Sequence, residues 1–320
     1  MSEIGSEFHR MPIENGHGFV LPRSGSLVFS GRTAIEAVLK YLPDIHTALL
    51  PSYCCDSMIA PFRDAGIDVR FYRVWWNDGM KVEINDSADI LLWCNYFGYQ
   101  NEMPDFHGVI IEDITHSLLS AIPSHPRADY LVASLRKWEP INCGGYCSVM
   151  IDGKVPPDEF VQLKTAAMEL KSAYLKSPQQ EKKETYLSMF GESNRWLAKH
   201  YSGLCIDSFS RAYLDRVDVE KQRRIRRENA RVLYEGLSKI VQLMFPIEDM
   251  DCPLFVPVLL PNRDAVRAHL TKNDIYCPIH WPKPEGCESN IYDLELSIIC
   301  DQRYGIEDME RIVSVIREVL

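Results

Sequence analysis

Two stretches decide the fold, Gly108-Val-Ile-Ile-Glu-Asp113 and Asp129-Tyr-Leu-Val-Ala-Ser134-Leu-Arg-Lys137. Each is a short run of aliphatic residues that ends in polar or charged side chains. Such runs, separated by helix-like or turn-rich connections, are typical of strands in an open and mainly parallel sheet. Ligands bind beyond the carboxyl ends of the strands in such sheets, so the side chains after each run are the candidates for a functional site.

The alternation of strand-like and helix-like segments extends from Thr47 to Asp152 and predicts an α/β fold, in which a mainly parallel sheet lies between helices. We expect strands at residues 48–51, 68–73, 89–94, 108–112, 130–134 and 145–151.

The second half of the chain is organised differently. Residues 158–200 are polar and predict exposed helices with a loop near residues 177–180. A long helix is expected at 218–240, with Ile225, Val232, Leu233 and Leu237 along one stripe. Its arginine cluster has two interpretations, a phosphate-binding surface or a solvated helix face. A strand, a helix, a strand and a terminal helix then predict a small α+β domain, at residues 253–260, 263–271, 295–299 and 306–320.

These segments divide the chain into three predicted parts, an N-terminal arm without a core of its own, a large domain, and the long helix with the small domain. The predicted boundaries are residues 1–26, 27–205 and 206–320.

The composition excludes several classes of protein. A net charge of −10 argues against nucleic acid as the main partner. The longest apolar stretch, near residues 252–260, is short and interrupted by proline, so no membrane span is expected. The N-terminus lacks a signal-like segment, which favours the cytoplasm. Ten cysteines without a paired CxxC or a spaced histidine favour reduced packing thiols over a metal site.

The first candidate site element is the turn Ser30-Gly31-Arg32-Thr33, which leads directly into an amphipathic helix. Free N–H groups and the helix dipole bind phosphate at such an end, Gly31 permits close approach, and Thr33 adds a hydroxyl. The alternative is ordinary N-capping by the serine.

The second element is Asp113 with His116, which follows the strand at 108–112. A carboxylate at this edge can keep a heteroaromatic nitrogen protonated, and the histidine can contact the same ring. The alternative is that Asp113 caps the next helix while His116 packs locally.

The third element is the Ser134-Leu-Arg-Lys137 turn, followed by Gly144-Gly145. A lysine by itself is most often a solvated surface charge. Beside an anion-binding helix end and an acidic partner for a pyridine nitrogen, however, its amine can form a Schiff base with an aldehyde. These are the requirements of pyridoxal phosphate.

From residue 27 onward the chain resembles the DegT/StrS family of sugar-nucleotide aminotransferases, which are pyridoxal-phosphate enzymes with the aspartate-aminotransferase fold. The matching stretches are Ser30-Gly-Arg-Thr-Ala34, Leu50-Pro-Ser-Tyr-Cys-Cys55, Asp64-Ala-Gly66, Asn95-Tyr-Phe-Gly98, Glu112-Asp-Ile-Thr-His116, Ser134-Leu-Arg-Lys137, Gly144-Gly145, Ile275-Tyr-Cys-Pro-Ile-His-Trp-Pro282 and Leu296-Ser-Ile-Ile-Cys-Asp-Gln-Arg-Tyr304.

The resemblance implies specific roles. Lys137 matches the lysine that binds the cofactor covalently, Asp113 the partner of the ring nitrogen, and His116 the residue near the ring hydroxyl. The cofactor's phosphate would contact Gly31, Arg32, Thr33 and Ser134, and Cys55 stands at a ring-stacking position that is often aromatic.

The chain also departs from the family near the lysine. Ser134 stands three residues before Lys137 where many relatives have five, and Trp138 replaces the usual asparagine. The residues expected near the substrate are Tyr96, Tyr99, His280 and Trp281, each of which has packing as its alternative role. The family is dimeric with shared sites, to which Ser208, Ser210 or Arg211 would contribute.

The implied reaction moves an amino group from an amino acid, glutamate by resemblance, to a keto or aldehyde sugar linked to a nucleotide, in polysaccharide or antibiotic sugar biosynthesis. Lys137 would carry protons between two carbons. The alternatives are another pyridoxal-phosphate reaction, such as dehydration of a deoxysugar, and a regulator or scaffold without turnover. Relatives that dehydrate carry histidine at the lysine position, so Lys137 favours transamination.

Overall fold

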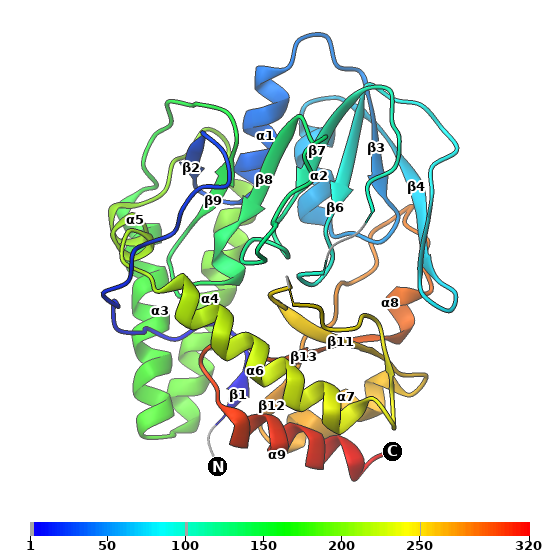
Figure 1. Ribbon diagram of the computed structural model, residues 1–320. Coiled ribbons are helices and arrows are strands. Elements are labelled where there is room, and N and C mark those ends of the chain that lie inside the picture. Colours follow the sequence, from blue (N-terminus) through cyan, green and yellow to red (C-terminus); the bar gives the residue numbers. More distant parts are fainter. Residues whose placement is uncertain (1–2, 100–101, 250) are drawn as a thin grey trace. The chain divides into compact units, whose positions relative to one another are not determined.

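The computed structural model describes residues 3–99, 102–249 and 251–320, which form two compact units (Figure 1). The described residues of the first unit are 7–43 and 132–219, and those of the second are 3–6, 44–99, 102–131, 220–249 and 251–320. The predicted arm therefore contributes to both units, while its residues 1 and 2 lie outside the described part of the chain.

The second unit contains the parallel strands. Strand β3 (Thr47–Pro51) pairs in parallel with β4 (Asp68–Trp76) and with β6 (Ile90–Cys94), and β6 pairs in parallel with β7 (Val109–Asp113). Helix α2 (Asp56–Asp64) connects β3 to β4. These strands are apolar because both faces of such a sheet are covered; every residue of β6 is buried.

Two further features complete this part of the second unit. Strand β5 (Met80–Glu83), which the sequence did not indicate, pairs antiparallel with β4. Beside β7, the N–H of Asp129 donates to the carbonyl of Ile110 at 3.0 Å, directly before β8 (Tyr130–Ser134) begins.

The first unit is built on antiparallel pairing and long helices. Strand β9 (Gly145–Cys147) pairs antiparallel with β2 (Ser26–Val28) and with the end of β8. Its other elements are α1 (Gly31–Tyr41), the 3-10 turn η1 (Leu135–Lys137), α3 (Asp158–Lys176), α4 (Gln180–Lys199) and α5 (Ser208–Leu214). Helices α3 and α4 lie side by side (Figure 1).

The C-terminal part of the second unit is the predicted α+β layer. Strands β10 (Gln242–Leu243), β11 (Phe255–Leu259) and β13 (Glu295–Ile299) form an antiparallel sheet in that order. Strand β1 (Ile4–Gly5) pairs in parallel with β12 (Ile275–Tyr276). The helices are α6 (Val219–Leu237), α7 (Arg263–Lys272), α8 (Ile291–Leu294) and α9 (Ile306–Arg317), and one apolar core joins α6, α7 and α9 to this sheet.

The predicted fold class is confirmed, although two local predictions were wrong. The sixth predicted strand ends at Cys147 rather than at residue 151. On α6, Ile225 and Val232 are only partly buried, while Arg226 is fully buried and donates to the side chain of Gln302 at 2.8 Å and to the carbonyl of Leu254 at 3.1 Å. Its charge suggested that Arg226 would lie on a solvated helix face. The side chain is buried instead, and its hydrogen bonds compensate the free-energy cost of burying the charge.

Candidate functional site

The turn predicted to bind phosphate lies at the start of α1, in the first unit. Ser30 is its N-cap, because its Oγ accepts from the N–H of Thr33 at 3.2 Å. The hydroxyl of Thr33 donates to the carbonyl of Tyr201 at 2.8 Å and lies 3.0 Å from Oγ of Ser30. The Thr33 hydroxyl is thus committed within the unit, and Gly31 and Arg32 are the first two residues of α1.

Glycines bring this turn close to strands β8 and β9. A Cβ atom on Gly31 would lie 3.2 Å from the Cβ of Ser134, and one on Gly145 would lie 2.3 Å from the carbonyl oxygen of Ser30. The structure therefore places the Ser134 side chain directly beside the start of α1. A hydroxyl next to the N-terminus of a helix is a suitable arrangement for an oxyanion.

Lys137 lies in η1, in the turn that follows Ser134, and is half-buried. The turn is anchored on both sides: the N–H of Leu135 donates to the carbonyl of Gly144 at 3.1 Å, and Trp138 is fully buried. Trp138, the departure from the family's asparagine, is therefore a core residue that fixes the end of the turn. Gly31, Ser134 and Lys137 thus belong to one local arrangement in the first unit.

In the second unit, Glu112 and Asp113 have different environments, because successive strand residues face opposite sides of a sheet. Glu112 accepts hydrogen bonds from the side-chain amide of Asn95 at 2.7 Å and from the N–H of His125 at 2.8 Å. Asp113 is 8% exposed and accepts at Oδ1 from the N–H of Thr115 at 2.8 Å. Glu112 thus holds the loop after β7, while Asp113 stands at the strand's carboxyl end.

His116 is oriented by the backbone, since its Nδ1 lies 3.1 Å from the N–H of Phe97 and accepts its hydrogen bond. The neutral ring therefore carries its proton on Nε2. Its ring centroid lies 5.5 Å from that of His280 and 5.7 Å from that of Trp281. Three predicted site residues from distant parts of the sequence thus meet in the second unit.

His280 is held by two residues that the sequence analysis did not include, Glu295 and Ser297. Nδ1 of His280 lies 2.7 Å from Oγ of Ser297, the Ser297 hydroxyl donates to Glu295, and Glu295 also accepts the N–H of His280 at 2.7 Å. Since the Ser297 proton is directed to the carboxylate, Nδ1 of His280 is the donor in its contact with Ser297. No local feature of the sequence distinguishes these two residues from other polar residues of a strand.

The other predicted substrate residues are packed more deeply. Tyr96 is 2% exposed and donates from its hydroxyl to the carbonyl of Tyr53 at 2.6 Å. The ring of Tyr99 stacks on Phe245, with centroids 4.7 Å apart. Burial raises the pKa of both tyrosines well above the ordinary value, so both remain protonated donors.

Cys55, the candidate for ring stacking, is half-buried at the N-cap of α2, with its Sγ 2.8 Å from Oγ of Ser57. Its neighbour Tyr53 has a larger aromatic environment, with ring centroids 5.2 Å from Trp281 and 5.1 Å from Tyr292.

The residues considered for a partner subunit's site make contacts within their own unit. Ser210 is fully buried, donates to the Asp207 carboxylate and accepts from the N–H of Asn142 at 3.0 Å. Arg211 pairs with Asp215 at 3.1 Å. Ser210 is therefore unavailable to another subunit without local rearrangement.

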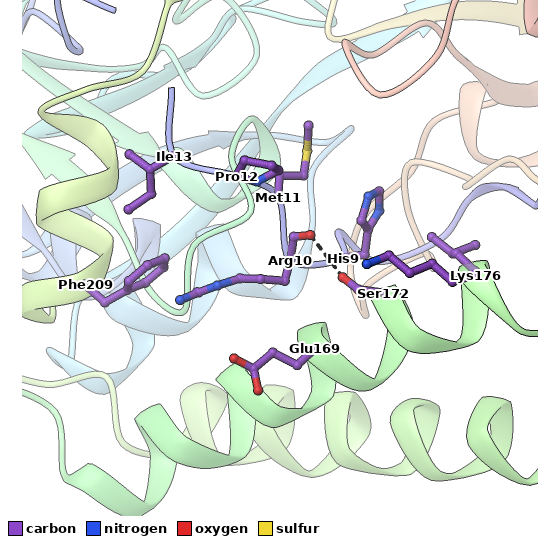
Figure 2. A pocket seen from close by; sticks show the side chains of 10 residues that line it. His9, Arg10, Met11, Pro12, Ile13, Glu169, Ser172, Lys176 and Phe209 are labelled. Atoms are coloured by element: carbon purple, nitrogen blue, oxygen red, sulfur yellow. Dashed lines mark hydrogen bonds between the residues drawn. The ribbon is translucent and has the colours of Figure 1, made fainter. Parts of the chain in front are cut away.

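A cavity of about 710 Å³ lies between residues 9–13 and helices α3 and α5 of the first unit (Figure 2). Arg10 and Phe209 both line this cavity, and the guanidinium carbon of Arg10 lies over the ring of Phe209, 3.5 Å from its centroid. None of the predicted site residues lines this cavity.

Two searches of the described residues bear on other classes of function. No helix in residues 3–99, 102–249 and 251–320 combines the length and apolar character needed to cross a bilayer. Over the same ranges, no cluster of three or more His, Cys, Asp or Glu side chains could hold a metal ion.

Comparison with solved structures gives extensive similarity in fold. A DegT DnrJ EryC1 StrS aminotransferase from Brucella abortus is 15% identical with a TM-score of 0.61, over 92% of this chain and 85% of that one. The PLP form of a sugar aminotransferase from Streptococcus pneumoniae is 13% identical with a TM-score of 0.64, over 92% and 88%.

A sugar aminotransferase from Micromonospora echinospora is 13% identical with a TM-score of 0.63, over 92% and 87%. The chain has the fold of these sugar aminotransferases. No protein-family model matches its sequence, and no curated protein is significantly similar to it.

Proposed function

We propose that this protein is a pyridoxal-phosphate-dependent aminotransferase that moves an amino group from an amino acid to a keto or aldehyde sugar. The observation that carries the proposal is the close approach of Gly31 and Ser134 directly before Lys137, in a chain with the sugar aminotransferase fold. The fold alone is compatible with several functions, and these side chains supply the chemistry that distinguishes among them.

The residues of the first unit fit the cofactor. The start of α1 and the Ser134 hydroxyl present hydrogen-bond donors for a phosphate, and the missing Cβ of Gly31 leaves the two adjacent. Lys137 supplies the amine that holds the cofactor and afterwards moves a proton. When bound, pyridoxal phosphate supplies an aldehyde and an electron-withdrawing ring.

The residues of the second unit supply the complementary groups. Asp113 is the carboxylate that would keep the cofactor's ring nitrogen protonated, with one oxygen already positioned by Thr115. Nδ1 of His116 accepts from the N–H of Phe97 and Nδ1 of His280 contacts the hydroxyl of Ser297, so both imidazole rings are held in fixed orientations. Imidazole rings donate and accept hydrogen bonds, which suits a ligand with hydroxyl groups.

We propose glutamate as the donor and a nucleotide-linked sugar as the acceptor, in a homodimer with shared active sites in the cytoplasm. The support is the sequence resemblance together with the fold of the sugar aminotransferases. The pathway would be the synthesis of a polysaccharide or antibiotic sugar.

Absorbance spectroscopy tests the proposal. Purified protein supplied with pyridoxal phosphate should develop a visible band of lysine-bound cofactor, and Lys137→Ala should lack that band while retaining the wild-type circular dichroism. Absence of the band in the wild type would refute the proposal.

Glutamate then separates a transaminase from a cofactor-binding regulator. A transaminase must convert the visible band to the ultraviolet band of the aminated cofactor, and a nucleotide-linked keto sugar must restore the visible band. A band unchanged by a panel of amino acids would favour a regulator without turnover.

A further inference from the structure

Lys164 on helix α3 is a buried ammonium group without a hydrogen bond. The residue is 4% exposed, and its Nζ has no hydrogen-bond partner among the described residues. Its environment is partly apolar, with Nζ 4.5 Å from the ring centroid of Phe190. Because an ammonium group has three donors and its burial is costly, such a group requires a ligand, water or counter-ion.

Arg136 acts electrostatically on the Lys164 ammonium and, like it, has a buried donor atom. Its Nε is buried and no described residue accepts a hydrogen bond from it. Burial lowers the pKa of Lys164, and the positive charge of Arg136 lowers it further, which shows that the two cations repel one another. Arg136 is adjacent in sequence to Lys137, and burial lowers its pKa while the charge of Glu7 raises it.

Glu7 is the carboxylate that faces these cations. Its Oε2 lies 3.7 Å from Nζ of Lys164, which is close enough for attraction between charges and too far for a hydrogen bond. The other oxygen accepts from the side-chain amide of Asn194 at 3.1 Å, and Lys171 donates to the Glu7 backbone carbonyl at 2.6 Å.

The charges in this group do not balance. Lys164, Lys171 and Arg136 all act electrostatically on Glu7, so three positive charges face one negative charge. The Glu7 side chain is 39% exposed, whereas that of Lys164 is 5% exposed. An excess of two positive charges beside an accessible carboxylate matches a dianion better than a second carboxylate.

We infer that Lys164 and Arg136 form an oxyanion site that binds a dianionic phosphoryl group, separate from the phosphate turn at Gly31 and Ser134. Lys164 donates from its unused ammonium protons, and Arg136 donates from its guanidinium. Glu7 partly neutralises the site when it is empty and competes electrostatically with the ligand. This inference does not depend on the proposed transamination, because it concerns different side chains.

Calorimetric titration with inorganic phosphate tests the site, at low salt and with the protein saturated with pyridoxal phosphate. Lys164→Met should weaken binding by about ten- to a hundredfold, as expected for a charge-assisted hydrogen bond. Glu7→Gln should instead tighten binding, because it removes the competing negative charge while keeping the acceptor for Asn194. Lys176→Met, which removes an exposed charge from the same helix, is the matched control and should leave the affinity unchanged.

Three results would overturn the inference: phosphate affinity unchanged by Lys164→Met, affinity weakened by Glu7→Gln, or binding that disappears when the cofactor's own phosphate site is filled. Folding of the variants is checked by thermal unfolding, where methionine suits the apolar contact with Phe190. If the protein binds phosphate as described but no pyridoxal phosphate, the proposed function fails and the oxyanion site remains.

Discussion

Gly31 and Ser134 approach so closely that a Cβ atom on the glycine would lie 3.2 Å from the Cβ of the serine. This contact joins the first turn of α1 to the end of β8 inside the first unit. It places the Ser134 side chain beside the turn, whereas the hydroxyl of Thr33 donates to the carbonyl of Tyr201.

Substitutions at Ser134 and Thr33 should therefore affect different properties, the first the affinity for the cofactor and the second the stability of the fold. Ser134→Ala should weaken pyridoxal-phosphate binding by about ten- to a hundredfold, with little change in stability, because a hydrogen bond to a charged phosphate is lost. Thr33→Val should lower the free energy of unfolding by about 1–3 kcal/mol, since the Tyr201 carbonyl loses its donor. Fluorescence titration measures the affinity and urea unfolding the stability; equal effects on affinity would contradict the assignment.

Gly145 is required by packing against the phosphate turn. A Cβ there would lie 2.3 Å from the Ser30 carbonyl oxygen, and backbone atoms cannot move as a flexible side chain does. Gly145→Ala should lower the free energy of unfolding by about 1–3 kcal/mol or more. Gly191→Ala in α4 is the control, because its Cβ would meet only a side-chain nitrogen of Arg195, at 3.4 Å. This substitution should stabilise the helix by about 1 kcal/mol, because alanine favours the helix over glycine.

Arg226 should be a stability residue despite its charge. Arg226→Met removes the donors for Gln302 and for the carbonyl of Leu254, and we expect a loss of about 2–4 kcal/mol in the free energy of unfolding. Arg224→Met on the exposed side of the same helix breaks a pair with Glu228 at 3.3 Å and should cost less than about 1 kcal/mol. Equal losses in chemical denaturation would mean that Arg226 is solvated.

Asp301 should contribute to the acid sensitivity of the second unit. Burial alone would raise its pKa, but the paired hydrogen bonds and charge of Arg303, at 2.7 and 2.9 Å, hold the pKa below its ordinary value. A depressed folded pKa stabilises the protein above the unfolded value of about 3.9, and this stability is lost as pH falls through the folded value.

Asp301→Asn should therefore lower the melting temperature at pH 7 and flatten the fall in stability below about pH 4. Asp264→Asn, at an exposed carboxylate that pairs with Arg263, is the matched control for the loss of a carboxylate beside an arginine. Melting temperatures measured at closely spaced pH values decide the matter; an unchanged slope for Asp301→Asn would contradict the assignment.

Much of the fold follows from local pattern. The strands Tyr130–Ser134 and Glu295–Ile299 have the predicted bounds, because each is a short apolar run between polar residues. Strand β5 escaped prediction since Met80–Glu83 has little apolar character and is a strand through its pairing with β4. Contact between distant segments thus overrode local preference.

The candidate site was only partly predictable. Asp113 and Lys137 could be proposed from their positions after strands, because the direction of a parallel sheet places such ends at one edge. Glu295 and Ser297 could not, since nothing local distinguishes a glutamate that orients a histidine from one at a strand end.

The sequence by itself determined the α/β class, the order of most elements and the residue types able to hold pyridoxal phosphate, because periodicity and turn chemistry act over short distances. The tertiary structure decided which hydroxyl beside α1 donates to a distant carbonyl, which nitrogen of His280 donates to Ser297, and that Arg226 and Lys164 are buried. These properties depend on neighbours distant in the chain, and a buried polar group is defined by the partners that packing gives it.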